Sequence, residues 1–217
     1  MATFVTQGLL KKINKQGLSK LSVTNQYEVN ISGLDSNQSL VKFISDTHNL
    51  DTNWIIRNGG LMCSDATLPT SSFATSEVKD NFQGINQQFA HTRLYVDTDF
   101  TFYVDEDYRM IKFFEGWMDF ISGGAYDGTA STVKSNENSK TFYRRFHYPN
   151  EYKVPTIQVA KFNRGDKSKS LINYKFFNAF PKSMQSMQVS YGGSELLKVT
   201  VSLAYDRYIF ESGLVNK

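Results

Sequence analysis

Polar and apolar residues alternate most regularly in two segments of this chain, residues 94–104 and residues 197–205. An alternation with a period of two residues is typical of a β-strand that places one face on a core. Each segment is therefore predicted to form one strand. The residues of the core face are Leu94, Val96, Thr98, Phe100, Phe102 and Val104 in the first segment, and Leu197, Val199, Val201, Leu203 and Tyr205 in the second.

Shorter segments show the same alternation and add turns between strands. Tyr27, Val29 and Ile31 predict a short strand near the start of the chain. Glycines supply the positive φ angles that tight turns need, so two glycine-containing segments are predicted to join hairpins. These turns are Arg164-Gly165-Asp166, between strands at 157–163 and 171–179, and Tyr191-Gly192-Gly193-Ser194.

One segment changes to a helical period. Apolar residues recur every three or four positions after the acidic triplet Asp105-Glu106-Asp107, which predicts a helix over about 106–121 with one apolar face. Negative charge favours the start of a helix, so Asp105 or Asp107 is predicted to cap the first turn. Gly123-Gly124 is predicted to end the helix. The apolar residues at this spacing are Met110, Ile111, Phe114, Trp117, Met118 and Ile121.

The remaining segments are predicted to be loops, apart from a weaker helical turn at 39–45. The loops are 47–60, 125–139 and the tail after Phe210. The middle loop is rich in Gly, Ser, Thr and Asn and is long enough to be flexible and to become ordered only on contact with a partner.

The composition supports a β-rich fold. Seventeen Phe and twelve Tyr against four Pro favour strands, because large flat side chains pack well on a pleated surface. The predicted fold is mainly β, an antiparallel β-sandwich or barrel with one flanking helix and long loops, in a single domain over 1–217. Cys63 is the only cysteine, which excludes an intrachain disulfide and fits synthesis in a reducing cytoplasm. No run approaches the roughly 20 apolar residues of a membrane-spanning helix, so no membrane partner is expected.

The sequence contains no catalytic constellation, and we predict neither an enzyme nor a cofactor. The three histidines lie far apart, and the motifs of zinc proteases, serine hydrolases and phosphate-binding loops are absent. Asp97 and Asp99 offer oxygen ligands for a divalent cation, but they also fit the polar face of a strand, which we favour. No metal site is predicted.

Residues 140–148 leave a nucleic-acid alternative open. Arg144 and Arg145 lie between the aromatic residues Tyr143 and Phe146, a pattern that suits phosphate contacts with base stacking. Tyr and Arg are also over-represented at protein interfaces, and we favour an interface for this segment. The alternative function is a β-barrel that binds single-stranded nucleic acid.

Charge is distributed unevenly along the chain although the net charge is only +3. Residues 46–107 hold ten acidic and three basic residues, whereas residues 140–182 hold ten basic and two acidic residues. Charge blocks are often only solvated faces. Two oppositely charged surfaces would, however, let one copy meet the next head to tail, in rings or filaments.

Three parts of the sequence resemble the tail tube proteins of contractile-tailed bacteriophages, especially the large myovirus type. They are Cys63-Ser-Asp-Ala-Thr-Leu-Pro69 with the polar hairpin after it, the strand 94–104 that leads into the helix, and the C-terminal part. In that last part, Phe177-Asn-Ala-Phe-Pro181 contains an Ala-Phe-Pro turn, which precedes a hairpin and a long strand ending in Ala204-Tyr-Asp-Arg-Tyr208. The resemblance covers roughly 22–33 and 61–208, with 34–60 as an insertion and no close match at 125–139.

The resemblance implies a structural virion protein, made in the host cytoplasm. Six copies would form a ring, and rings would stack into the inner tail tube through which phage DNA passes. A baseplate tube-initiator and the inner-tube protein of a type VI secretion system are the alternatives within the same fold. The implied partners are further copies of the chain, the tail sheath and the baseplate proteins, with DNA passing without specific binding.

The expected sites follow from the need for DNA to slide without sticking. A basic channel wall would hold phosphates through counterion release, so the polar hairpin is predicted to face the lumen and the basic block to face other subunits or the sheath. The lumen candidates are Glu77, Asp80, Gln83, Asn86 and Gln88. The interface candidates are Arg144, Arg145, Lys161, Arg164, Lys167 and Lys169.

Overall fold

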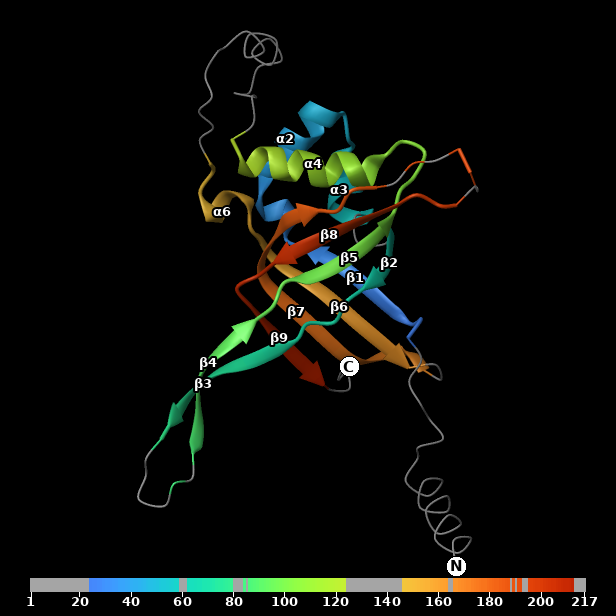
Figure 1. Cartoon of the computed structure of the whole chain (residues 1–217). Helices are drawn as coiled ribbons and strands as arrows, with labels where there is room; N and C mark the ends of the chain where they lie inside the picture. The colour runs from blue at the N-terminus through green and yellow to red at the C-terminus, as the bar shows by residue number, and fades with distance from the viewer. Residues whose placement is uncertain are drawn as a thin grey trace, which may run out of the picture.

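Strands dominate the computed structural model of the protein (Figure 1). It describes residues 24–58, 62–79, 84, 86–123, 146–163, 166–187, 189, 191–192 and 195–212. The strands are β1 (Tyr27–Ser32), β2 (Cys63–Ala66), β3 (Ser71–Val78), β4 (Gln87–Tyr95), β5 (Thr98–Tyr103), β6 (Val154–Asn163), β7 (Asp166–Met184), β8 (Lys198–Ala204) and β9 (Arg207–Ser212). The helices are η1 (Leu34–Ser36), α2 (Gln38–His48), α3 (Thr52–Asn58), α4 (Arg109–Ile121) and α6 (Pro149–Tyr152).

The main sheet is antiparallel throughout and curves almost into a barrel. Its strands follow the order β1-β6-β7-β8-β5-β2, and β9 pairs with β7 beside β8. The two outermost strands meet where the Tyr27 hydroxyl donates a hydrogen bond to the Cys63 carbonyl at 3.3 Å. The predicted antiparallel β class, the strand at Tyr27 and the hairpin of β6 and β7 are therefore confirmed.

The long strand β7 belongs to both halves of this sheet. Residues 172–177 pair with β9, and residues 180–184 pair with β8. Between them Asn178 has a φ of 56°, a conformation that Asn tolerates better than most residues. The sequence prediction of a turn at residues 179–181 was wrong, because the strand continues through them after the single left-handed residue Asn178.

The core lies between the sheet and the layer formed by α2, α3 and α4. Alternate residues of β1, β5, β6 and β8 point inward, and the aromatic rings of Phe102 and Phe114 meet at 5.1 Å between β5 and α4. The Trp117 indole donates a hydrogen bond to the Tyr152 carbonyl at 2.9 Å, so its polar atom is satisfied inside the core. The residues that α4 buries are Met110, Phe113, Phe114, Gly116, Trp117 and Phe120.

The predicted helix is confirmed, but it begins at Arg109. Residues 106 and 107 form a turn, and Tyr108 is left-handed with a φ of 56°. The Asp105 carboxylate accepts a hydrogen bond from the Arg109 backbone N–H at 2.7 Å, as expected of a residue that satisfies the first turn. At the other end Gly123 has a φ of 66° and its N–H reaches the Phe120 carbonyl, so the predicted stop is confirmed.

One helix is longer than the sequence predicted, and a second helix lies where a loop was predicted. The weak turn predicted at 39–45 is the eleven-residue helix α2, and the loop predicted at 47–60 contains α3. Trp54 and Ile55 are buried, and the Asp51 carboxylate accepts the Asn53 N–H. α3 therefore forms because packing and an acidic cap compensate for poor helix propensity.

The strand predicted at 94–104 is two strands. The sheet ladder stops at Val96 and Asp97, β5 continues in the barrel, and β4 pairs with β3 in a separate two-stranded sheet. We call this hairpin of β3 and β4 the arm; it projects away from the helices (Figure 1). The C-terminal strand is confirmed as β8, whereas residues 211 and 212 of the tail predicted after Phe210 still belong to β9. The loop 125–139 lies outside the described residues.

Candidate assembly surfaces

The arm carries two different faces. Residues directly opposite each other on paired strands share a face, and Leu94 lies opposite Ser72 while Phe89 lies opposite Ser76. Along β3 the same face continues through Ala74 and Val78. This face, which we call the apolar face of the arm, carries no charged side chain among these residues.

The apolar face is open to solvent. Phe89 is 54% exposed and Leu94 is 46% exposed, and the next residue of the same alternation, Val96, is 54% exposed. A two-stranded hairpin alone is marginally stable in water, and a row of exposed apolar side chains usually marks a contact surface. The apolar face is therefore a candidate surface for contact with another protein chain.

The other face of the arm collects three of the predicted lumen residues near its tip. Glu77 lies directly opposite Gln88, and the Asn86 side-chain amide donates a hydrogen bond to the Glu77 carboxylate at 2.9 Å. Lys79 also pairs with Glu77, at 3.2 Å. Asp80 and Gln83 lie outside the described residues. The three described members of the predicted group thus form a polar cluster on one face, and the orientation of this face in an assembly stays a prediction.

Aromatic residues join the base of the arm to the corner between β8 and β9. The Arg93 guanidinium lies 5.3 Å from the ring centres of both Tyr95 and Tyr208. It also donates to the Tyr208 hydroxyl at 3.2 Å and to the Ser71 hydroxyl at 3.1 Å. The Tyr205 hydroxyl donates to the Val96 carbonyl at 2.7 Å. These contacts connect both strands of the arm with the barrel.

Burial raises the pKa of Tyr205 to about 12, and the nearby Tyr208 and Asp97 add to the effect. Its hydroxyl therefore stays protonated and able to donate over the whole neutral range.

A second exposed apolar group lies at the other end of β5 and β8. Thr98 pairs with Leu203 near the arm, whereas Tyr103 pairs with Lys198 at the far end, next to the connection between β7 and β8. In that connection Val189 is 84% exposed and Leu196 is 77% exposed. The described part of the subunit thus presents apolar side chains at both ends of the same strands.

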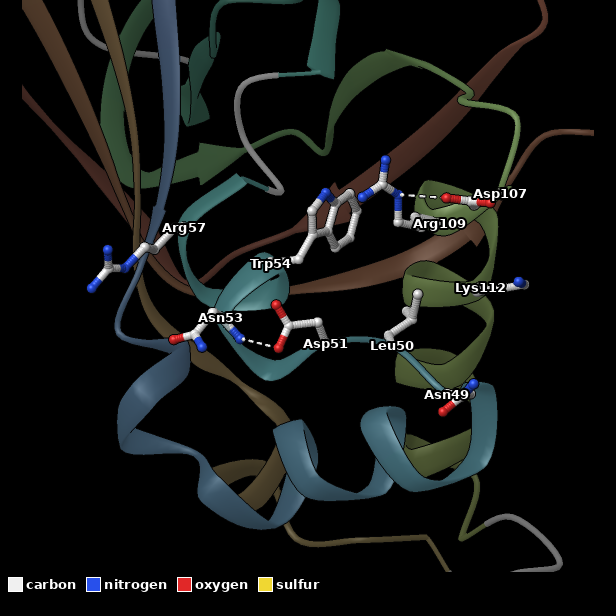
Figure 2. A pocket seen from close by; sticks show the side chains of 9 residues that line it. All are labelled: Asn49, Leu50, Asp51, Asn53, Trp54, Arg57, Asp107, Arg109 and Lys112. Carbon is white, nitrogen blue, oxygen red and sulfur yellow. Dashed lines mark hydrogen bonds and ion pairs between the residues drawn. The ribbon is translucent and has the colours of Figure 1, made fainter.

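A cleft of about 500 Å³ lies between α3 and the start of α4 (Figure 2). The Arg109 guanidinium lies 5.2 Å from the Trp54 ring centre and pairs with Asp105 and Asp107, while Arg57 and Lys112 point away from Trp54. Burial alone would raise the pKa of Asp105, but the bonds from Arg109 outweigh burial and lower it. The residues lining this cleft fasten α3 to α4 and contain no nucleophile beside a base.

The residues that the sequence offered for metal binding or catalysis, as far as they are described, make contacts that support the fold. Asp97 forms an ion pair with Lys182 at 2.5 Å, and no group of three metal-ligating side chains gathers among the described residues. Burial raises the pKa of the Cys63 thiol to about 12, so the thiol is not a reactive thiolate at neutral pH. The His147 ring stacks on Phe120 with ring centres 4.2 Å apart, and its Nδ1 lies 2.9 Å from the Glu151 carboxylate.

The lysines of the basic block whose side chains are described bond within their own subunit. Lys153 pairs with Asp206 and Lys175 pairs with Glu211, each at 2.8 Å. Lys161 donates to the backbone carbonyls of Gln26 and Phe162 at 3.1 and 3.2 Å. The side chains of the other interface candidates, Arg144, Arg145, Arg164, Lys167 and Lys169, lie outside the described part, as do those of Tyr143 and Lys140.

In the described ranges, no helix has both the length and the apolar character needed to cross a bilayer.

Comparison with known proteins gives one family and several structural neighbours. The family model described as phage tail tube protein matches residues 22–211. No match is found among curated proteins.

Solved structures give the second comparison. The chain is similar to the tube terminating cap of the anti-feeding prophage, with 13% identity, a TM-score of 0.50 and coverage of 89% of this chain and 92% of that chain. It is also similar to a chain of the 6-fold symmetrised baseplate of the anti-feeding prophage, with 11% identity, a TM-score of 0.50 and coverage of 88% and 96%. At these identities the likeness shows the fold, and it agrees with the β class predicted from the sequence.

Proposed function

Because this chain belongs to the phage tail tube protein family, we propose that its copies join through the arm into rings that stack to form a tail tube. Family membership makes the chain a structural tube protein and a virion component, as the sequence resemblance predicted. The finer proposal concerns which surfaces build the tube, how many copies a ring contains and what passes through it.

The observation that carries the proposal is the exposed apolar face of the arm. In a subunit alone, Phe89, Leu94 and Val96 remain in water, although Phe89 and Leu94 belong to a strand that is paired with β3. Burial of such side chains stabilises by about 25 cal/mol per Å² of apolar surface. A second copy of the chain is the partner that a self-assembling tube supplies, and contact with it would remove this surface from water.

The position of the exposed groups supports head-to-tail contact. The arm lies at one end of β5 and β8, and Val189 and Leu196 lie beyond the other end. A patch that meets a different patch on the next copy makes a heterologous contact, which closes into rings or continues as a stack. We propose six copies a ring, as in the resemblance, with the single domain 1–217 as the repeating unit and 34–60 as its insertion.

The polar cluster near the tip of the arm is proposed to line the channel. Glu77, Asn86 and Gln88 gather on the face opposite Phe89, so one hairpin can face a neighbour and the lumen at once. A wall without free cations lets DNA pass without counterion release. Asp80 and Gln83 belong to the same proposal.

The tail sheath and the baseplate are the proposed further partners. The basic residues of 140–182 are proposed to contact other subunits or the sheath, among them Arg144, Arg145, Arg164, Lys167 and Lys169. Lys161 contributes less to such a contact, because its ammonium group already bonds two carbonyls.

Electron microscopy of the purified full-length protein tests the proposed function. We expect rings or tubes without nucleic acid, and we expect Phe89→Ser to abolish them. Gln88→Ser is the matched control, because it changes the neighbouring residue on the opposite face. A wild-type protein that stays monomeric at high concentration contradicts the assembly, and a Phe89→Ser variant that assembles normally contradicts the role of the arm. Rings that do not elongate favour a baseplate initiator of the same fold.

The lumen assignment has its own test. Tubes that carry Glu77→Lys together with Gln88→Lys are expected to retain linear DNA at low salt and release it at high salt, whereas wild-type tubes retain none. Variant tubes that fail to retain DNA at low salt would place these residues outside the channel.

A further inference from the structure

Among the described residues, the strands of the arm bond to the barrel at one corner, while Asp97 in the connection to β5 pairs with Lys182. In the described part of the chain, the side-chain hydrogen bonds and ring contacts between the arm and the barrel all reach Tyr205 or Tyr208. Arg93 lies between the Tyr95 and Tyr208 rings, and the Tyr208 hydroxyl donates to Ser71 on the other strand at 3.2 Å. Without these contacts the arm would be joined to the barrel by the two chain connections, 67–70 and 96–97.

The corner that holds the arm is itself fixed to the centre of the sheet. Between the two tyrosines, the Asp206 carboxylate accepts hydrogen bonds from Lys153 and from the Asn178 side-chain amide, both at 2.8 Å. The Asp206 backbone N–H donates to the Phe177 carbonyl at 3.0 Å. The bend of β7 and the bend between β8 and β9 are therefore bonded to each other.

We propose that Tyr205, Asp206 and Tyr208, together with Arg93, form a mount that sets the direction in which the arm leaves the barrel, and that this direction determines whether copies assemble. This inference rests on the proposed function, because it assumes that the arm contacts another copy.

The length of the arm explains why its direction matters. β3 has eight residues, which is about 26 Å at 3.3 Å per residue. A rotation of about 10° at the base displaces the tip by roughly 4–5 Å, which is about the distance between neighbouring strands. Phe89 lies opposite Ser76, about 17 Å from the base, and would move by about 3 Å away from a preformed site on the neighbouring copy, although each subunit would still be folded.

The chemistry of the mount suits this role. A guanidinium between two tyrosine rings combines cation–π attraction with planar hydrogen bonding, and both constrain its orientation. Arg93→Ala removes both, Arg93→Lys keeps the charge without the planar fork, and Tyr208→Phe removes only the hydroxyl bonds. Arg207→Ala is the matched control, because Arg207 lies in the same corner but stacks on Phe177, 5.3 Å away, and not on the arm.

The first measurement is the direction of the arm in the subunit. Spin labels at Gln88→Cys on the arm and Glu28→Cys on β1 of the barrel, in a Cys63→Ser background, report the distance between these two sites. We expect a narrow distance distribution in the otherwise unchanged chain and in Arg207→Ala. We expect a clearly broader distribution in Arg93→Ala, an intermediate one in Tyr208→Phe, and an unchanged far-UV spectrum in all of them.

The second measurement is assembly of the full-length chain without labels. We expect the critical concentration for tube formation to rise at least about tenfold in Arg93→Ala, less in Arg93→Lys, and not at all in Arg207→Ala. A narrow distribution in Arg93→Ala, or a broad one with an unchanged critical concentration, overturns the mount. A wild-type protein that forms no rings contradicts the proposed function instead, and the distance measurement still decides whether Arg93 positions the arm.

Discussion

Residues 94–104 and 197–205 have the same period-two pattern and different structures. In β8 the alternate residues Val199, Val201 and Leu203 are buried on the core side of the barrel. In the first segment Phe100 and Phe102 are equally buried, but Leu94 and Val96 are exposed because their strand has left the barrel. The pattern correctly predicts strands with one apolar face in both places, but it does not say what covers that face.

The difference separates two uses of apolar side chains. Those of β5 and β8 stabilise the subunit, whereas those of the arm gain their stabilisation only from a partner, according to the proposed function. A substitution in β5 or β8 is therefore expected to lower the stability of the subunit. A substitution of the same chemical type in the arm is expected to weaken assembly and leave the stability of the subunit nearly unchanged.

The largest expected difference is between two phenylalanines. Phe100→Ala empties a fully buried site and should cost about 3–5 kcal/mol of unfolding free energy. Phe89→Ala should change the stability of the monomer by about 0.5 kcal/mol or less, because the ring is already half in water. Urea denaturation of dilute monomer measures both values. A large loss of stability in Phe89→Ala would show that the arm packs on its own subunit.

A smaller effect is expected from placing the same hydroxyl group in the two strands. Val201→Thr buries a hydroxyl in an apolar core and should cost about 1–3 kcal/mol. Val96→Thr puts the hydroxyl at a half-exposed position and should leave monomer stability nearly unchanged, while it weakens tube formation. Thermal unfolding and sedimentation measure the two properties separately, and equal losses of monomer stability would remove the distinction between the strands.

The smallest expected effect concerns the corner where the two regions meet. Hydrogen bonds from Lys153 and Asn178 lower the pKa of Asp206 below its ordinary value. Such a carboxylate contributes stability above its unfolded pKa, near 3.9, and the contribution is lost as the pH falls through the lower folded pKa. Asp206→Asn should therefore cost about 1 kcal/mol at pH 7, since the carboxylate is partly exposed, and less near pH 2. A loss of unfolding free energy in Asp206→Asn that does not change with pH would mean that the charge of Asp206 is not involved.

Much of the barrel could be predicted because its residues carry local signals. The alternations of β1, β6 and β8 and the helical period of α4 are visible in the chain, and each belongs to an element buried on one side. α3 could not be predicted from propensity, because Thr, Asn, Trp and Ile are moderate helix formers. Asp51 before Thr52 was the available signal of a cap. The bend at Asn178 has no local signal that distinguishes it from a turn, since only the partners of β7 on both sides show that the strand continues.

The candidate surfaces were only partly predictable. Glu77, Asn86 and Gln88 were grouped correctly because the polar hairpin is a local feature. The prediction of two opposed charge surfaces ignored tertiary pairing, in which Lys153, Lys175 and Lys182 each meet a carboxylate of the same subunit. The contact between Arg93 and Tyr208 joins residues 115 positions apart, and no spacing along the chain indicates such a pair.

That separation also orders events in time. A ribosome synthesises Arg93 long before Tyr208, so an arm can pair locally while the residues that fix its direction do not yet exist. If the mount is needed for assembly, a nascent chain cannot join a tube until almost all of its barrel has been made. Stalled chains that end before Tyr205 should accordingly fail to enter growing tubes. Their incorporation would show that assembly does not require the completed chain.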